Sequence, residues 1–129
     1  MDDAVRESRA LVADKRFPEA RKQFEAVLAA NPGTTEVIYA VGLLAFQLKD
    51  YPVAEENMKR LLGMGSRDPN NVRYLLGQIA EDQKHWPQAI RWYDEIAEGE
   101  HLLPARMRTA NAIAKQGRLD EARAFLRQV

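Results

Sequence analysis

The sequence contains no cysteine, which excludes disulfide bonds, thiolate metal ligands and cysteine nucleophiles. This absence leaves the compartment open, because cytoplasmic and periplasmic chains can equally lack cysteine. The chain also has no net charge, since 19 basic side chains are balanced by 19 acidic ones. A neutral chain lacks the electrostatic field that would draw it to nucleic acid or to an anionic membrane. We therefore expect no nucleic-acid partner.

Long apolar runs are missing as well. No stretch approaches the ~18 apolar residues that a membrane-spanning helix requires, so we expect no direct insertion into a membrane. Residues 1–30 hold no apolar run of the length found in a signal peptide, so this chain shows no targeting segment. The sequence therefore does not choose between cytoplasm and periplasm.

Residues typical of catalytic and metal sites are also scarce. The two histidines, His85 and His101, lie in different predicted turns. Glu98 and Glu100 stand close to His101, but no further ligand has the spacing of a metal site, which favours an ordinary surface loop. The sequence shows no Ser–His–Asp order, Gly-rich phosphate loop or pair of carboxylates in an evident cleft. We expect no catalytic residue, no cofactor and no metal.

What the sequence does contain is a short motif that recurs with a regular period. The motif is an aromatic residue, a proline, a variable residue and an alanine, and a looser fourth copy follows the three clear ones. The copies are Phe17-Pro18-Glu19-Ala20, Tyr51-Pro52-Val53-Ala54, Trp86-Pro87-Gln88-Ala89 and Leu119-Asp120-Glu121-Ala122. Small residues precede the motifs and large apolar residues follow them with the same period. The small residues before the motifs are Ser8, Gly42, Gly77 and Ala110. The large apolar residues after them are Phe24, Met58, Tyr93 and Leu126.

Between these landmarks, apolar residues recur at helical spacing, and no segment alternates as a strand would. Proline and glycine mark the ends of helices, as at Pro32-Gly33, Asp68-Pro69 and Gly117. The pattern predicts eight helices, at about 2–14, 18–30, 34–48, 51–63, 69–83, 86–98, 104–116 and 119–129. We expect an all-α array of four antiparallel pairs in a single domain, 1–129. The repeats would span about 1–34, 35–69, 70–102 and 103–129.

A helix–turn–helix unit of about 34 residues with these landmarks resembles the tetratricopeptide repeat, and the resemblance covers essentially the whole chain. Each repeat is numbered so that its motif alanine is position 20. The resemblance implies an α-α superhelix, of the kind found in bacterial arrays, with a non-catalytic role as a protein-binding scaffold or adaptor. It also implies close helix approach where Gly42 faces Ala54 and Gly77 faces Ala89. The sequence departs from the family at position 4, where Trp is common and Ile38 and Arg73 stand here.

The resemblance places partner binding on a concave groove formed by the first helix of each pair. The residues expected to line it are Val5, Arg9, Val12, Tyr39, Leu43, Phe46, Gln47, Tyr74, Gln78, Glu81, Met107 and Asn111. The middle of this groove is apolar and aromatic, which favours an extended or helical peptide with apolar anchors. The alternative is that Leu43 and Phe46 are covered as ordinary core. The clamp for a C-terminal carboxylate found in some relatives is absent, because Leu43 replaces its asparagine.

Two other roles stay open. The chain ends inside the eighth predicted helix without a polar helix to cover Leu126 and Val129. We expect a piece of a longer array, the alternative being a small protein that hides this end by forming a homo-oligomer. The second role is that of a regulatory segment of a longer enzyme or envelope-assembly protein. In every case the identity of the protein or peptide partner is unknown.

Overall fold

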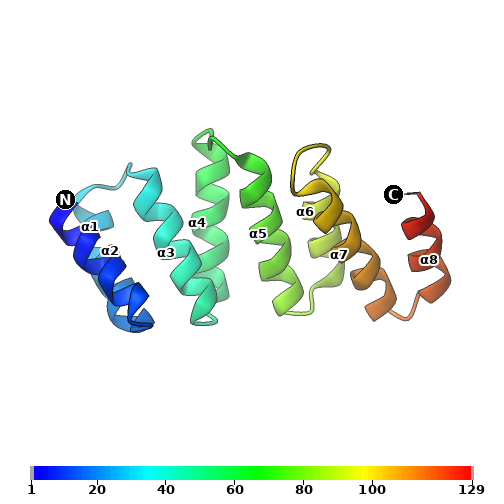
Figure 1. Ribbon diagram of the computed structural model, residues 1–129, viewed down its shortest axis with the longest axis horizontal. Coiled ribbons are helices and arrows are strands. Elements are labelled where there is room, and N and C mark those ends of the chain that lie inside the picture. The colour runs from blue at the N-terminus through cyan, green and yellow to red at the C-terminus, as the bar shows by residue number, and fades with distance from the viewer. Residues whose placement is uncertain (1, 129) are drawn as a thin grey trace. The chain divides into compact units, whose positions relative to one another are not determined.

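The computed structural model describes residues 2–128 and contains only helices within that range (Figure 1). The helices are α1 (Asp2–Ala13), α2 (Phe17–Ala30), α3 (Thr35–Gln47), α4 (Tyr51–Gly63), α5 (Pro69–Asp82), α6 (Trp86–Asp94), α7 (Leu102–Lys115) and α8 (Leu119–Arg127). The predicted all-α chain of four helical hairpins is confirmed. Val129, which we expected at the exposed end of the last helix, lies outside the described residues.

The second helix of each of the first three hairpins begins with the repeated motif. The second residue of α2, α4 and α6 is a proline: Pro18, Pro52 and Pro87. In the first turn of a helix a missing backbone N–H breaks no helical hydrogen bond. The predicted N-cap of α5 is also confirmed, because the Asp68 carboxylate accepts a hydrogen bond of 3.1 Å from the backbone N–H of Asn71. The motif therefore marks where each of these helices starts.

The turn inside each hairpin has the same backbone conformation in all four repeats. One residue has a positive φ: 60° at Lys15, 65° at Lys49, 62° at Lys84 and 81° at Gly117. The backbone N–H of the following residue donates to a carbonyl five positions earlier, for example Arg16 to Leu11 at 2.8 Å. This arrangement is the Schellman motif, which ends a helix by satisfying its last carbonyl groups.

The sixth and seventh helices differ from the prediction at their shared loop. We expected α6 to continue to about residue 98, but it ends at Asp94. The chain turns there, Ile96 is fully buried in the core, and Gly99 adopts a φ of 91°. The side-chain amide of Asn70 donates to the Glu98 carbonyl at 3.1 Å and holds the loop. These tertiary contacts outweigh the local helical pattern, and α7 begins two residues before Pro104.

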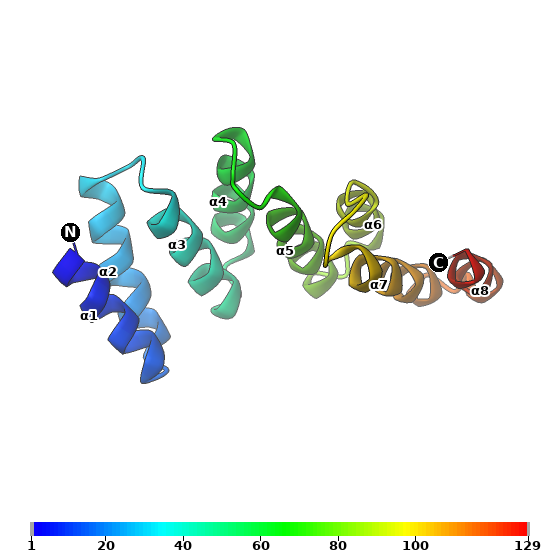
Figure 2. The ribbon, with the colours of Figure 1, turned by 45° about the horizontal axis from the view of Figure 1, so that its top comes forward.

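The contacts within the chain define two compact units, one ending at Ser66 and the other beginning at Arg67. In the first unit α2 packs against both α1 and α3, and α3 packs against α4 (Figure 2). The residues of its core cluster are Val5, Ala20, Phe24, Val27, Val37, Val41 and Leu44. Arg21 on α2 adds a hydrogen bond of 2.6 Å to Asp50, which precedes α4.

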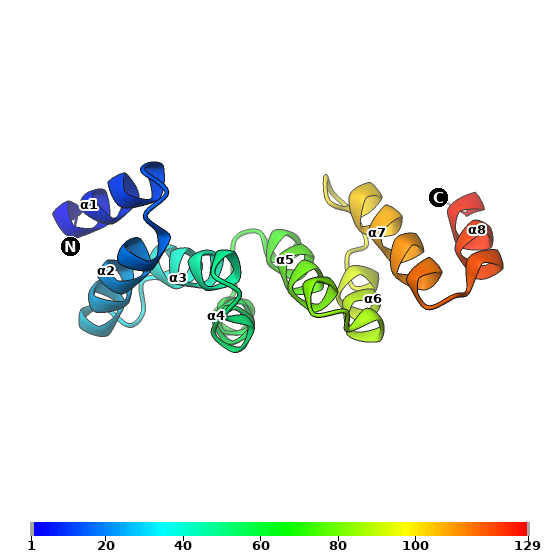
Figure 3. The same ribbon diagram turned by 90° about the horizontal axis from the view of Figure 1, so that it is seen from below.

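The second unit repeats this arrangement with α6 packed against both α5 and α7, and α7 packed against α8 (Figure 3). The residues of its core cluster are Ala80, Ala89, Tyr93, Ile96 and Ala105. Within the described residues no helix is both long enough and apolar enough to span a bilayer.

Two glycines allow the helices of a hairpin to pack closely. A β-carbon added at Gly42 would lie 2.7 Å from Cε of Met58, and one added at Gly77 would lie 2.2 Å from Cε1 of Tyr93. We expected these glycines to face the motif alanines. The added β-carbons would meet the large residues four positions after those alanines, because each glycine leaves the space that the large side chain fills.

Candidate partner-binding hollow

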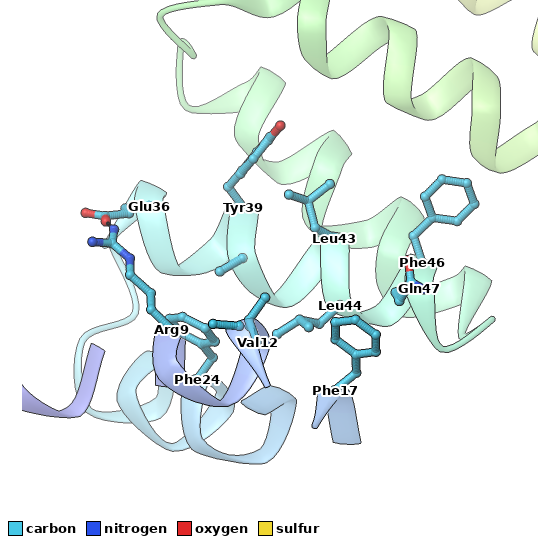
Figure 4. A pocket seen from close by; sticks show the side chains of 12 residues that line it. Arg9, Val12, Phe17, Phe24, Glu36, Tyr39, Leu43, Leu44, Phe46 and Gln47 are labelled. Carbon is cyan, nitrogen blue, oxygen red and sulfur yellow. Dashed lines mark ion pairs between the residues drawn. The ribbon is translucent and has the colours of Figure 1, made fainter. Parts of the chain in front are cut away.

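An apolar hollow of about 640 Å³ lies in the first unit, between α1, α2 and α3 (Figure 4). Six of the predicted groove residues line it together: Arg9, Val12, Tyr39, Leu43, Phe46 and Gln47. The other lining residues were not among those predicted: Ala13, Phe17, Phe24, Glu36, Ala40 and Leu44. Phe17 had a signal, since it is the aromatic residue of the repeated motif. Glu36 had one too, since it precedes Tyr39 by three residues on the same predicted helix and so shares its side.

One side of α3 faces the hollow and another side faces the core. Figure 4 shows Tyr39, Leu43 and Phe46 projecting from the same side of the helix, while Leu44 points toward side chains of α1 and α2. Leu44 is buried, whereas Tyr39, Leu43 and Phe46 are only half-buried. These three residues are spaced four and three apart, so they form one continuous stripe on the helix.

Charge is confined to one end of the hollow. Arg9 of α1 forms an ion pair with Glu36 of α3, as Figure 4 shows. Both side chains are more than half exposed, so the pair adds little to stability. At the other end the ring of Phe46 lies 6.4 Å from that of Tyr51. The charges neutralise each other, and the remaining wall offers mainly carbon to a ligand.

Val5 was predicted to line the groove, but it is only 9 % exposed and belongs to the core cluster of the first unit. The reason is its position on α1, where it meets the cluster that α2 and α3 complete. Val5 also borders a smaller hollow, together with Arg9 and Glu36. Val5 is therefore a packing residue in this structure and no part of the larger hollow.

Two predicted groove residues of the second unit, Tyr74 and Glu81, belong to a hydrogen-bonded network. The hydroxyl of Tyr93 donates to Glu81 at 2.6 Å. Arg108 donates to the other Glu81 oxygen at 3.0 Å and to the Tyr74 hydroxyl at 2.8 Å. The ring of Tyr74 also stacks on His101, with 5.1 Å between centroids. The network joins α5, α6 and α7, so these side chains have internal partners.

The network shifts two ionisation equilibria. Burial, followed by the hydrogen bond to Glu81, raises the pKa of the Tyr93 hydroxyl well above its ordinary value of 10.0. Burial acts to lower the pKa of Arg108, but the hydrogen bond to Tyr74 and the charge of Glu81 outweigh it and raise that pKa. Both shifts favour the state that the network needs, a neutral tyrosine beside a charged arginine.

The remaining predicted groove residues lie elsewhere in the second unit. Gln78 is half-buried on α5. Met107 and Asn111 are exposed on α7 and line a second hollow, of about 300 Å³, between α7 and α8. Residues of α8, including Leu119 and Leu126, form its other wall. Apart from Gln78, the structure thus divides the predicted groove residues among a hollow, a core, a network and a second hollow.

One group among the described residues has the composition of a metal site. Ligand atoms of Asp68, Glu100 and His101 all lie within 4.8 Å of one another. Glu100 and His101 are adjacent in the sequence, whereas Asp68 is more than 30 residues away in the chain and was not predicted to join them. Both carboxylates are exposed, and Asp68 already caps α5. Their position at the starts of α5 and α7 is where acidic groups balance helix dipoles.

Four hairpins with a shared turn geometry define this chain as a helical-repeat protein. A family model for the tetratricopeptide repeat matches residues 5–69 and again residues 39–101, which together cover well over half of the chain. The chain belongs to the tetratricopeptide repeat family. Proteins of this family are typically non-catalytic scaffolds for protein–protein interaction.

Comparison with solved structures gives the same fold. A crystal structure of MamA superposes with a TM-score of 0.84 at 16 % identity, covering 98 % of this chain and 69 % of that one. MamA from Desulfovibrio magneticus RS-1 gives 0.82 at 14 % identity, covering 98 % and 72 %. MamA AMB-1 gives 0.78 at 20 % identity, covering 96 % and 68 %. At these identities the likeness establishes the fold alone.

A curated relative by sequence is a TPR repeat-containing protein of Pseudomonas aeruginosa. It is 37 % identical over 51 residues, which are 40 % of this chain. The match spans only 9 % of the length of that relative. The relative therefore supports the family and carries no information about the partner of this chain.

Proposed function

We propose that the chain is a non-catalytic adaptor, and that the hollow of the first unit binds a segment of a partner protein through large apolar side chains. The observation behind this proposal is the half-buried stripe of Tyr39, Leu43 and Phe46 along a hollow of about 640 Å³. That volume falls within the usual range for ligand pockets, about 300–1,000 Å³.

The lining indicates what kind of segment would fit. A peptide with apolar anchors would gain affinity by removing Tyr39, Leu43 and Phe46 from water. A strongly charged peptide would find one neutral ion pair, Arg9 with Glu36, and little else to contact. The proposed ligand is therefore an extended or helical segment with two or more large apolar residues, held mainly by hydrophobic contact.

Affinity capture from a lysate of the source cell tests the proposal. The baits are the wild-type chain, the double variant Tyr39→Ala/Phe46→Glu and the control variant Met64→Glu. Met64 is 42 % exposed in the same unit but lies outside the hollow, so it tests the effect of a new charge alone. We expect a partner that the wild type and the control retain at high salt and that the double variant loses.

Circular dichroism and thermal unfolding of each bait separate lost binding from lost structure. The double variant should keep the helicity of the wild type, because both replaced side chains are only half-buried. Retention of the same partner by a folded double variant would refute a binding role for the hollow. Strong destabilisation would show instead that the stripe is core, and the smaller change Tyr39→Ala would then test binding alone.

A further inference from the structure

A different surface, formed by α7 and α8, holds several exposed apolar side chains. Met107 is 54 % exposed, Leu119 57 % and Leu126 40 %. All three line the second hollow, whose floor includes Ala110 and Ala122. Helices α7 and α8 lie side by side at the C-terminal end of the second unit (Figure 3).

The internal repeat shows what covers the equivalent surface on an earlier hairpin. The residues Met107, Ala122 and Leu126 each follow Val5, Ala20 and Phe24 by 102 positions. In the first unit those three residues form one core cluster with three residues of α3: Val37, Val41 and Leu44. Phe24 is consequently only 3 % exposed, against 40 % for its counterpart Leu126. The surface of the α7–α8 hairpin thus has the composition of a helix-binding surface.

The helices that follow a hairpin share one pattern of buried residues, all of them apolar except Thr109 in α7. Their buried residues are spaced four and three apart, at Val37, Val41 and Leu44 in α3, Val72, Leu76 and Ile79 in α5, and Ala105, Thr109 and Ala112 in α7. Helix α1 has Asp3, Glu7 and Ala10 at the same positions, and all three are exposed. A second copy of the chain would have to bury these two carboxylates to place α1 on the α7–α8 surface, which is unfavourable.

The charged residues around the second hollow indicate which charge its occupant would carry. From residue 102 to residue 128 the chain has six basic and two acidic side chains. Arg106 and Arg108 pair with Asp94 and Glu81 of the preceding helices. Arg118 and Arg123 pair in turn with Glu121 and Asp120, so a net charge of +2 remains, from Lys115 and Arg127. The α7–α8 hairpin therefore has a net positive charge, with Arg123 at the hollow itself, and it favours an occupant with acidic residues beside its apolar stripe.

From this precedent and this charge, we propose that the α7–α8 surface binds an amphipathic helix of a partner. That helix has apolar residues at i, i+4 and i+7 and an acidic flank. This is a second binding site, separate from the hollow between α1, α2 and α3, and it does not depend on the function proposed above.

A synthetic peptide taken from the chain itself provides the probe. It has the sequence of residues 69–82 with Asn70→Glu and Gln78→Glu, so that Val72, Leu76 and Ile79 supply the required spacing. The control peptide adds Val72→Asp and Leu76→Glu, which copy Asp3 and Glu7 of α1. Both are labelled for fluorescence anisotropy and closed with a hydrocarbon staple, because a free helix of this length is only marginally stable.

We expect the probe to bind the wild-type chain and the control peptide not to bind. Met107→Glu/Leu126→Glu should weaken binding at least about tenfold, and Arg123→Glu/Arg127→Glu should weaken it and reduce its salt dependence. Leu103→Glu is the control in the protein, because Leu103 is 59 % exposed on α7 but does not line the hollow. That variant should bind as the wild type does.

Three results would overturn this inference. The first is failure of the stapled probe to bind, or equal binding of the control peptide. The second is loss of probe binding in Phe46→Glu with no loss in Met107→Glu/Leu126→Glu, which would assign the peptide to the other hollow. The third is a concentration-dependent mass in analytical ultracentrifugation that Leu126→Glu abolishes, which would identify the occupant as a second copy.

Discussion

Gly77 is a residue whose missing side chain determines how two helices meet. A β-carbon there would lie 2.2 Å from the ring of Tyr93, which is itself buried and hydrogen-bonded to Glu81. The ring cannot move aside without breaking that bond. The close approach of α5 and α6 therefore depends on glycine at this position.

Gly77→Ala should lower the free energy of unfolding by about 1–3 kcal/mol, the usual cost of overfilling a packed site. Urea denaturation followed by circular dichroism measures this change. Gly63→Ala is the matched control, because Gly63 is also helical and no atom would lie within 4 Å of its added β-carbon. A neutral Gly77→Ala would mean that α5 and α6 are not packed as closely as described.

The lysines in the hairpin turns are the second feature at this scale. Lys15, Lys49 and Lys84 adopt positive φ values, a conformation that costs an ordinary L-residue energy and costs glycine very little. The fourth repeat has Gly117 at the equivalent position. Three of the four turns are therefore slightly strained, and one is not.

Replacing Lys84 by Gly should raise the free energy of unfolding by roughly 0.5–1 kcal/mol, because relief of the strain exceeds the added flexibility of the unfolded chain. The reverse change, Gly117→Ala, should lower it by about 1 kcal/mol. Thermal unfolding of the two variants measures both effects. Changes of the same sign would contradict the turn geometry.

The partners of Arg108 are an example of contacts that the sequence did not predict. It binds Glu81 and Tyr74, which are 27 and 34 positions away, and neither separation is one that a single helix brings together. The apolar landmarks behave differently, because their period is visible along the chain. Packing positions were therefore predictable, whereas this polar network depends on how α5, α6 and α7 meet.

At the scale of elements, the same network links three helices through one buried hydroxyl. The Tyr93 pKa is higher in the folded chain than in the unfolded one, where it is near 10. The protonated hydroxyl therefore stabilises the fold. That stabilisation is complete below about pH 10 and decreases as the pH rises above it.

The free energy of unfolding should accordingly fall more steeply above about pH 10 in the wild type than in Tyr93→Phe, by up to about 1.4 kcal/mol per pH unit. Denaturation in urea at a series of alkaline pH values gives both slopes. The phenylalanine variant also separates ionisation of Tyr93 from ionisation of other groups. Parallel slopes would show that Tyr93 can ionise without opening the network.

Helix ends were predicted less well than helices. The predicted α4 agrees with the structure at both ends, since Pro52 and Gly63 mark them in the sequence. Helix α6 ends early because Ile96 turns into the core and Asn70 holds Glu98. The hydrogen bond between Asn70 and Glu98 joins residues 28 positions apart and does not affect the spacing of apolar residues near Asp94. The sequence therefore could not indicate where α6 ends.

At the scale of the whole chain, two compact units share one type of hairpin. In repeat proteins each hairpin contacts only its neighbours, so stability is local. The periodic landmarks made this fold class predictable from residue spacing alone. The groove was less predictable, because positions such as Val5 and Glu81 have the expected phase but are occupied by packing and hydrogen bonds.

Local stability gives a prediction for hydrogen exchange. Phe24→Ala removes a ring from the core of the first unit and should cost that unit about 3–5 kcal/mol. Backbone amides up to Ser66 should then exchange faster, while amides around Tyr93 in the second unit change much less. Mass spectrometry of exchanged peptides measures both. Equal acceleration throughout would show that the chain unfolds as one cooperative body.

The exposed carboxylates of α1 have a consequence for protein engineering. A hairpin joined after α8 would find an apolar surface ready to pack against, with Leu119 and Leu126 already in place. A hairpin joined before α1 would meet Asp3 and Glu7, and both would have to be replaced by apolar residues. Extending this array by design is therefore straightforward in one direction along the chain and requires redesign in the other.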